Sequence, residues 1–147
     1  MVEVPSLSQQ QKEIATVGGG CFWCIEAAFD LLEGVETVES GYMGGKHPNP
    51  SYDTVCTGVT GHAEVVKVTF NHSAISYQDI LRIFFSIHDP TTLNRQGNDI
   101  GTQYRSVIFY HSPEQETISK EVIATLALNK FFDAPIVTEI SRSQMFY

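Results

Sequence analysis

A run of three glycines, Gly18-Gly19-Gly20, leads directly into Cys21 and then into a segment with helical spacing. Residues 13–17 before it have the composition of a short strand. After it, apolar residues recur at intervals of three and four, as on one helix face, at Phe22, Ile25, Phe29 and Leu32. The pattern predicts a strand-to-helix turn at Cys21 and a helix over 21–33 that ends at Gly34.

The position of Cys21 favours a reactive thiol. Free backbone N–H groups and the helix dipole stabilise an anion at a helix start, so we expect this cysteine to have thiolate character. The glycines allow a tight turn and let a ligand approach the backbone closely. The alternative is a small buried apolar side chain beside an ordinary loop. A second cysteine, Cys24, one helical turn later favours the reactive thiol.

Composition indicates an ordinary globular chain. Its 147 residues, of which 42% are hydrophobic and 18% charged, predict a single domain, 1–147, with a loose polar lead-in at 1–11. The net charge of −8 argues against nucleic-acid binding. Because the sequence contains neither a membrane-spanning apolar run nor a signal peptide, we expect a cytoplasmic protein that does not bind membranes. We also expect a monomer.

The three cysteines are too few and too uneven in number for a secreted disulfide scaffold. A close pair in a reducing compartment points to redox chemistry or to metal binding. A zinc site would need Cys21, Cys24, Cys56 and His62 as ligands. Their spacing fits usual zinc motifs poorly, so we expect neither a metal nor another cofactor.

The order of predicted elements indicates the fold class. Strands are predicted at 13–17, 35–42, 63–70, 106–110 and 135–140, and helices at 21–33, 76–88 and 112–128. Ser76 and Ser112 are predicted helix caps, with Pro113 at the first helical position and Gln115 closing a capping box. This order predicts a ferredoxin-like βαββαβ α+β sandwich with an extra C-terminal helix and strand. Two long irregular loops, at 44–62 and 89–104, are expected near the Cys21 turn.

Glu64 begins the clearest strand and shares its alternating face with Val66, Val68 and Phe70. Burial there would raise the pKa of Glu64 and keep the carboxyl protonated near neutral pH, so that it could donate a proton. The alternative is a glutamate at a strand end that turns into water. Strand periodicity alone does not decide between the two.

Several separated motifs occur together in one order. They are Gly20-Cys21-Phe22-Trp23, Ser40-Gly41-Tyr42, Tyr52, Gly61-His62-Ala63-Glu64 and the run from Gly97 to Ser106. From about Ile14 onward, the chain therefore resembles the A-type peptide methionine sulfoxide reductases. The resemblance implies reduction of methionine-S-sulfoxide, free or in proteins, as repair of oxidative damage, with thioredoxin as the reductant.

The resemblance also implies roles for individual residues. These are Cys21 as nucleophile, Glu64 as acid, Tyr52 and Tyr104 as hydroxyls on the sulfoxide oxygen, Phe22 and Trp23 as the methyl pocket, and Asp99 as a nearby polar residue. Such a set suits the chemistry, because the sulfoxide oxygen leaves poorly unless it is protonated as the thiolate attacks. The reaction would leave a sulfenic acid on Cys21.

Two features differ from the family pattern. Many relatives continue past the position of Tyr147 with a tail that often carries a recycling cysteine, and many have glycine where this chain has Cys24. We therefore predict that Cys24 resolves the intermediate by forming a disulfide with Cys21. Cys56, in the first long loop, is the alternative resolving thiol.

Two other classes of function remain open from the residues alone. A thioredoxin-like disulfide oxidoreductase would place Cys21 and Cys24 at a helix start and Pro135 before a strand. It would not require Trp23 between the cysteines, nor the loops that carry Glu64 and Asp99. A non-enzymatic binding module would leave the activated cysteine unexplained.

Overall fold

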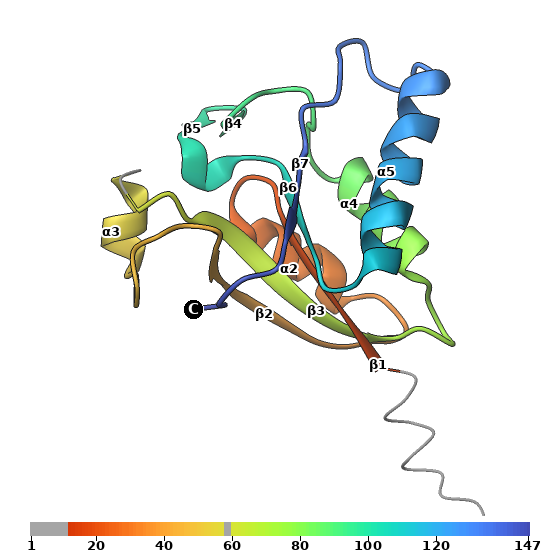
Figure 1. Cartoon of the computed structure of the whole chain (residues 1–147), viewed down its shortest axis with the longest axis horizontal. Helices are drawn as coiled ribbons and strands as arrows, with labels where there is room; N and C mark the ends of the chain where they lie inside the picture. The colour runs from red at the N-terminus through yellow and green to blue at the C-terminus, as the bar shows by residue number, and fades with distance from the viewer. Residues whose placement is uncertain (1–11, 58–59) are drawn as a thin grey trace, which may run out of the picture.

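The computed structural model describes residues 12–57 and 60–147, so the predicted lead-in at 1–11 lies outside the described residues. The elements in chain order are β1 (Lys12–Gly18), α2 (Phe22–Asp30), β2 (Val35–Met43), α3 (Tyr52–Cys56), β3 (Ala63–Asn71), α4 (Tyr77–Ser86), β4 (Arg95–Gln96), β5 (Asp99–Ile100), the 3₁₀ helix η1 (Thr102–Tyr104), β6 (Val107–Tyr110), α5 (Pro113–Leu128) and β7 (Glu139–Arg142) (Figure 1). Among the described residues, no helix has the length and apolar character needed to cross a membrane.

The main sheet has the strand order β2-β3-β1-β6-β7. Strand β1 is antiparallel to both of its neighbours, and β2 is antiparallel to β3. This is the arrangement of a βαββαβ unit, with β2-β3 as its hairpin. Helix α5 then leads to β7, which adds to the edge of the sheet parallel to β6. The α+β ferredoxin-like fold with an extra C-terminal helix and strand is therefore confirmed.

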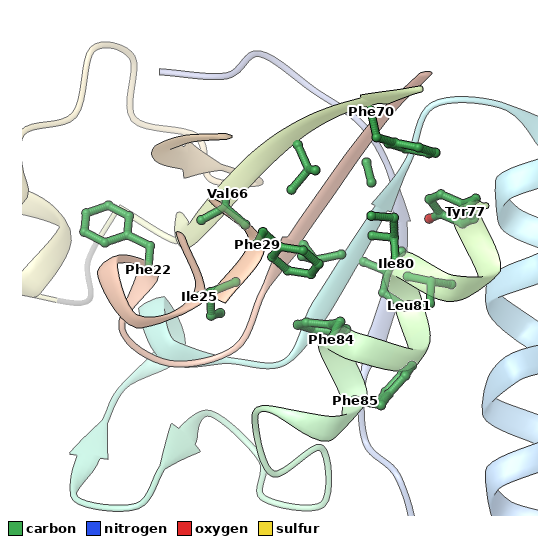
Figure 2. Packing of buried hydrophobic residues seen from close by; sticks show 14 of the residues in the cluster. Phe22, Ile25, Phe29, Val66, Phe70, Tyr77, Ile80, Leu81, Phe84 and Phe85 are labelled. Atoms are coloured by element: carbon green, nitrogen blue, oxygen red, sulfur yellow. The ribbon is translucent and has the colours of Figure 1, made fainter. Parts of the chain in front are cut away.

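The alternation along β3 divides the core in two. Val66, Val68 and Phe70 belong to the larger cluster, to which the helices contribute Phe29 and Phe84 among others. Figure 2 shows Phe29 of α2 between β3 and α4. The intervening strand positions supply the smaller cluster on the other face, which consists of Met43, Ala63, Val65, Val107 and Phe109. Glu64 therefore begins the strand face that the helices cover.

The two predicted loops contain short elements that local patterns did not predict. Helix α3 lies in the first of them, and Ser51 caps it by accepting a hydrogen bond from the Thr54 N–H at 3.2 Å. Thr54 completes this capping box in place of the more usual glutamate or glutamine. The β4–β5 ribbon and η1 lie in the second loop. Both loops lie on the same side of the molecule, as expected (Figure 1).

Two predicted boundaries were wrong by three or more residues. Helix α2 ends at Asp30 rather than Glu33, although Gly34 does have a positive φ of 90°. The last strand begins at Glu139 rather than 135, because the Val137 N–H donates instead to the Pro90 carbonyl at 2.8 Å.

The start of α5 also differs from its prediction in one contact. Ser112 caps the helix by accepting from the Gln115 N–H at 3.2 Å, as predicted. The Gln115 side chain, however, accepts from the backbone N–H of His111 at 2.8 Å, one residue before the cap. Ser76 caps α4 as expected.

Candidate active site

Cys21 is the N-cap residue of α2 and is half-buried. Its carbonyl accepts hydrogen bonds from the N–H groups of Cys24 at 3.2 Å and Ile25 at 3.4 Å, which begin the helix. Its side chain, in contrast, caps none of the described backbone N–H groups. The Cys21 sulfur therefore lies at the helix start without serving as the helix cap.

The backbone just before Cys21 is held by the second loop. Gly20 has a φ of 90°, in the left-handed region that glycine adopts readily. Its N–H donates to the carbonyl of Tyr104 at 3.1 Å. This hydrogen bond joins the turn to η1 and so brings a second candidate residue to the same end of the sheet.

Glu64 lies inside the protein, with only 2% of its surface exposed. One carboxyl oxygen accepts a hydrogen bond from the Phe22 N–H at 3.2 Å. Burial raises the pKa of Glu64, the hydrogen bond from Phe22 opposes this shift, and the negative charge of Asp99 adds to it. Of the two orientations that the sequence left open, the carboxyl takes the buried one, beside the first turn of α2.

The two predicted tyrosines come from different loops. Tyr52 begins α3 and stacks on Trp23, with ring centroids 5.5 Å apart. A hydrogen bond to the Cys56 side chain raises the pKa of Tyr52 to about 12. Tyr104 ends η1, and burial, together with the nearby charge of Glu64, raises its pKa. Both hydroxyls therefore keep their protons at neutral pH and can donate hydrogen bonds.

Three aromatic rings follow one another beside the turn. The Phe22 ring lies 5.0 Å from that of Trp23 and 5.5 Å from that of Tyr42. Phe22 is buried at the edge of the core (Figure 2), whereas Trp23 is 58% exposed. The ring contacts therefore run from the buried Phe22 to the exposed Trp23.

The two other cysteines lie near this cluster and are exposed free thiols. The Cys24 thiol donates a hydrogen bond to the sulfur of Cys21, and this contact raises the pKa of Cys24. Cys56 ends α3 and contacts Tyr52. Asp99, on the exposed β5 strand, is close enough for its charge to affect both Cys24 and Glu64.

The comparison with known proteins agrees with this geometry. A family model described as peptide methionine sulfoxide reductase matches residues 13–147. The chain belongs to this family. It is an oxidoreductase that reduces methionine sulfoxide with thiols.

Individual members are similar over most of the chain. The peptide methionine sulfoxide reductase MsrA of Polynucleobacter asymbioticus is 52% identical over 147 residues, which are 100% of this chain and 77% of that protein. The crystal structure of Mxr1 from Saccharomyces cerevisiae in reduced form has a TM-score of 0.87 and 34% identity, and covers 94% of this chain and 80% of that one. Mxr1 in complex with Trx2 shares the fold, with a TM-score of 0.70 and 24% identity over 94% of this chain and 81% of that chain.

The four residues that a zinc site would need are not gathered together in the described parts of this methionine sulfoxide reductase. Among residues 12–57 and 60–147, no three His, Cys, Asp or Glu side chains are grouped so that they could hold a metal ion. His62 instead has both ring nitrogens engaged in its own loop. Its Nδ1 accepts from the Gly45 N–H at 3.0 Å, and its Nε2–H donates to the His47 carbonyl at 2.6 Å.

One residue beside Glu64 was assigned no role from the sequence. Tyr42 stands opposite Glu64 in the β2–β3 register and is 9% exposed. Burial, together with the charge of Glu64, raises the pKa of Tyr42 to about 12. In the sequence, Tyr42 appeared only within the Ser-Gly-Tyr motif. Its place beside Glu64 follows from strand pairing, which no local pattern reveals.

Proposed function

We propose that the chain reduces methionine-S-sulfoxide, free or in proteins, with Cys21 as the nucleophile and Glu64 as the acid. One observation carries this assignment. The buried carboxyl of Glu64 accepts a hydrogen bond from the N–H of Phe22, the residue that follows Cys21. A carboxyl whose pKa is raised by burial is thus tied by the backbone to the residue next to a thiol at a helix start.

In the proposed reaction, the Cys21 sulfur attacks the sulfur of the sulfoxide while Glu64 protonates the oxygen. An S–S bond forms, the protonated oxygen then passes from the methionine sulfur to the Cys21 sulfur, and the S–O bond to methionine and the new S–S bond both break. Cys21 is left as a sulfenic acid, and methionine leaves. The methionine sulfur gains the two electrons that the cysteine sulfur loses. Protonation matters because it removes the negative charge that would otherwise develop on the oxygen.

The aromatic residues fit the two ends of the substrate. Tyr52 and Tyr104 are placed to donate hydrogen bonds to the oxygen, and their raised pKa values keep both hydroxyls protonated. Phe22 and Trp23 offer an apolar surface for the methyl group. Asp99 would act as a polar neighbour of the acid.

Recycling would use Cys24. Its thiol attacks the sulfenic sulfur of Cys21, water leaves, and a disulfide forms. The interaction of the Cys24 thiol with Cys21, which raises the pKa of Cys24, supports this step. Because Cys24 is exposed, a thioredoxin thiol could reach this disulfide and reduce it. We also place this single catalytic domain, as a monomer, in the cytoplasm, where free thiols persist.

The test is an oxygen-loss assay with dithiothreitol and a peptide that contains methionine sulfoxide. Mass spectrometry should show the loss of one oxygen from the S epimer and none with Cys21→Ser. Reduction of insulin disulfides without oxygen loss would support a thioredoxin-like oxidoreductase instead. Turnover by the Cys21→Ser variant would remove Cys21 from the mechanism.

A further inference from the structure

His88 lies against the backbone of the turn that carries Cys21. A Cβ placed on Gly19 would come within 2.6 Å of Cδ2 and 2.9 Å of Cγ of the His88 ring. The three atoms nearest to that position all belong to this ring. The φ of Gly19 lies outside the left-handed region, so its backbone does not call for glycine. The ring of His88 is therefore what leaves no room for a side chain at position 19.

Hydrogen bonds fix the ring from both sides. Its Nδ1–H donates to the Phe84 carbonyl at 2.6 Å, which leaves Nε2 to accept from the Ser106 hydroxyl at 2.8 Å. The Ser106 oxygen in turn accepts from Thr138 at 2.7 Å. The ring also stacks on Phe84, with centroids 4.0 Å apart. This chain of contacts joins the end of α4 to the segments that precede β6 and β7.

The ring is uncharged in this setting. Burial lowers the pKa of His88 to about 4, against the opposing effects of the Phe84 hydrogen bond and the Asp89 charge. A neutral ring with one donor and one acceptor matches the two partners that it has. The contacts of the ring, which are contacts of position rather than of proton transfer to substrate, are with Gly19, Phe84, Phe85 and Ser106.

We propose that His88 is a positioning residue, whose fixed ring supports the Gly19 backbone and thereby sets where the Cys21 sulfur lies relative to Glu64. The glycines of this turn give it little stiffness of its own. The Gln96 side chain packs against Gly20, so the turn is held by His88, just after α4, and by Gln96 of the second loop. The proposal rests on Cys21 being the nucleophile, as proposed above.

The experiment is a double-mutant cycle of Gly19→Ala and His88→Ala, read as the single-turnover rate at saturating methionine sulfoxide. We expect each single variant to lower this rate by about 10- to 100-fold, because small displacements of reacting groups are costly. In the double variant, the methyl group of Ala at position 19 no longer clashes with an imidazole ring. The rate of the double variant should therefore equal that of His88→Ala alone. The substrate concentration at half-saturation should stay unchanged throughout.

Two further variants separate positioning from general stability. Ser106→Ala keeps the bulk of the ring but releases its Nε2, and should lower the same rate by a smaller factor without changing half-saturation. His111→Ala is the matched control, since His111 is also partly buried and hydrogen-bonded, to Thr16 at 2.8 Å, at the far end of β6. It should unfold at lower urea concentration and keep the wild-type rate.

Three outcomes would overturn the role of His88: a wild-type rate in folded His88→Ala, losses that multiply in the double variant, or an equal rate loss in His111→Ala. If His88→Ala does not fold, a wild-type rate in Ser106→Ala would count against the proposal in the same way. Failure of the proposed function looks different, because Cys21→Ser would then turn over whatever stands at position 88.

Discussion

Glu64 accepts its hydrogen bond from the Phe22 N–H over 3.2 Å, which ties the acid on β3 to the first turn of α2. Cys21, the proposed nucleophile, immediately precedes Phe22, so one hydrogen bond links Glu64 to the residue beside it. Because Glu64 is also buried, its pKa is raised above the ordinary glutamate value.

The first prediction concerns the acid in catalysis. Glu64→Gln keeps the shape and the hydrogen bond from Phe22 but has no proton to give. We expect its single-turnover rate to fall by about two to four orders of magnitude, the usual contribution of general acid catalysis. The matched control is Glu36→Gln, which removes a surface carboxylate paired with Lys12 at 3.2 Å and should leave the rate unchanged.

The second prediction concerns the pH dependence of stability. Below the ordinary glutamate pKa of 4.5, Glu64 is protonated in both the folded and the unfolded chain and contributes no dependence. Between that value and its raised folded pKa, only the folded state holds the proton, so the free energy of unfolding falls as pH rises. Glu64→Gln lacks this loss.

Urea unfolding between pH 4 and pH 9 would test this sign. The stability of Glu64→Gln relative to wild type should grow as pH rises from 4.5 and level off above the folded pKa of Glu64. Parallel pH profiles for the two proteins would mean that the Glu64 carboxyl has the same pKa in the folded and the unfolded chain. The claim that burial raises this pKa would then be wrong.

Local sequence patterns predicted an element correctly where its own residues carry a clear periodicity or a helix cap. Strand β3 alternates cleanly, and α5 begins with Ser112 and Pro113 as cap and first helical residue. Helix α3 escaped prediction because it has only five residues and a threonine in its capping box. The start of the last strand depends on pairing with β6, a tertiary contact that no local pattern encodes.

For the candidate site too, local patterns located some residues, whereas tertiary contacts determine the position of others. The glycine turn and helical spacing placed Cys21 correctly at a helix start, and strand alternation placed Glu64 on the face that the helices cover. The position of Tyr42 beside the acid depends on the β2–β3 register, which includes an irregularity between Val35 and Thr37. Counting residues along two strands cannot locate such a shift.

The third prediction concerns the two tyrosine hydroxyls. Tyr52→Phe and Tyr104→Phe each keep the ring, including the stack of position 52 on Trp23. Each removes one proposed donor to the sulfoxide oxygen, so each should slow the single turnover by roughly tenfold, the effect of one hydrogen bond. Tyr110→Phe, at the end of β6, is the control and should have no effect. If neither site variant slows the reaction, Glu64 alone serves the oxygen.

The last prediction concerns recycling, for which the chain offers two thiols. Cys24 already donates a hydrogen bond to Cys21, whereas Cys56 contacts Tyr52. On a regular helix the Cβ vectors of Cys21 and Cys24 diverge, so the first turn must loosen for a disulfide to form. Cys21 stands at the N-cap beside the glycine turn, where such a change involves few hydrogen bonds. We therefore expect a Cys21–Cys24 disulfide after one turnover.

Peptide mapping of the oxidised protein and two serine variants would decide between the thiols. Cys24→Ser should keep the first turnover, because Cys21 and Glu64 are intact, but lose repeated turnover with thioredoxin. Cys56→Ser should keep both, since only its contact with Tyr52 is removed. A mapped Cys21–Cys56 link, or full cycling without Cys24, would show instead that α3 supplies the resolving thiol, and that the Cys24 hydrogen bond serves only the reduced state.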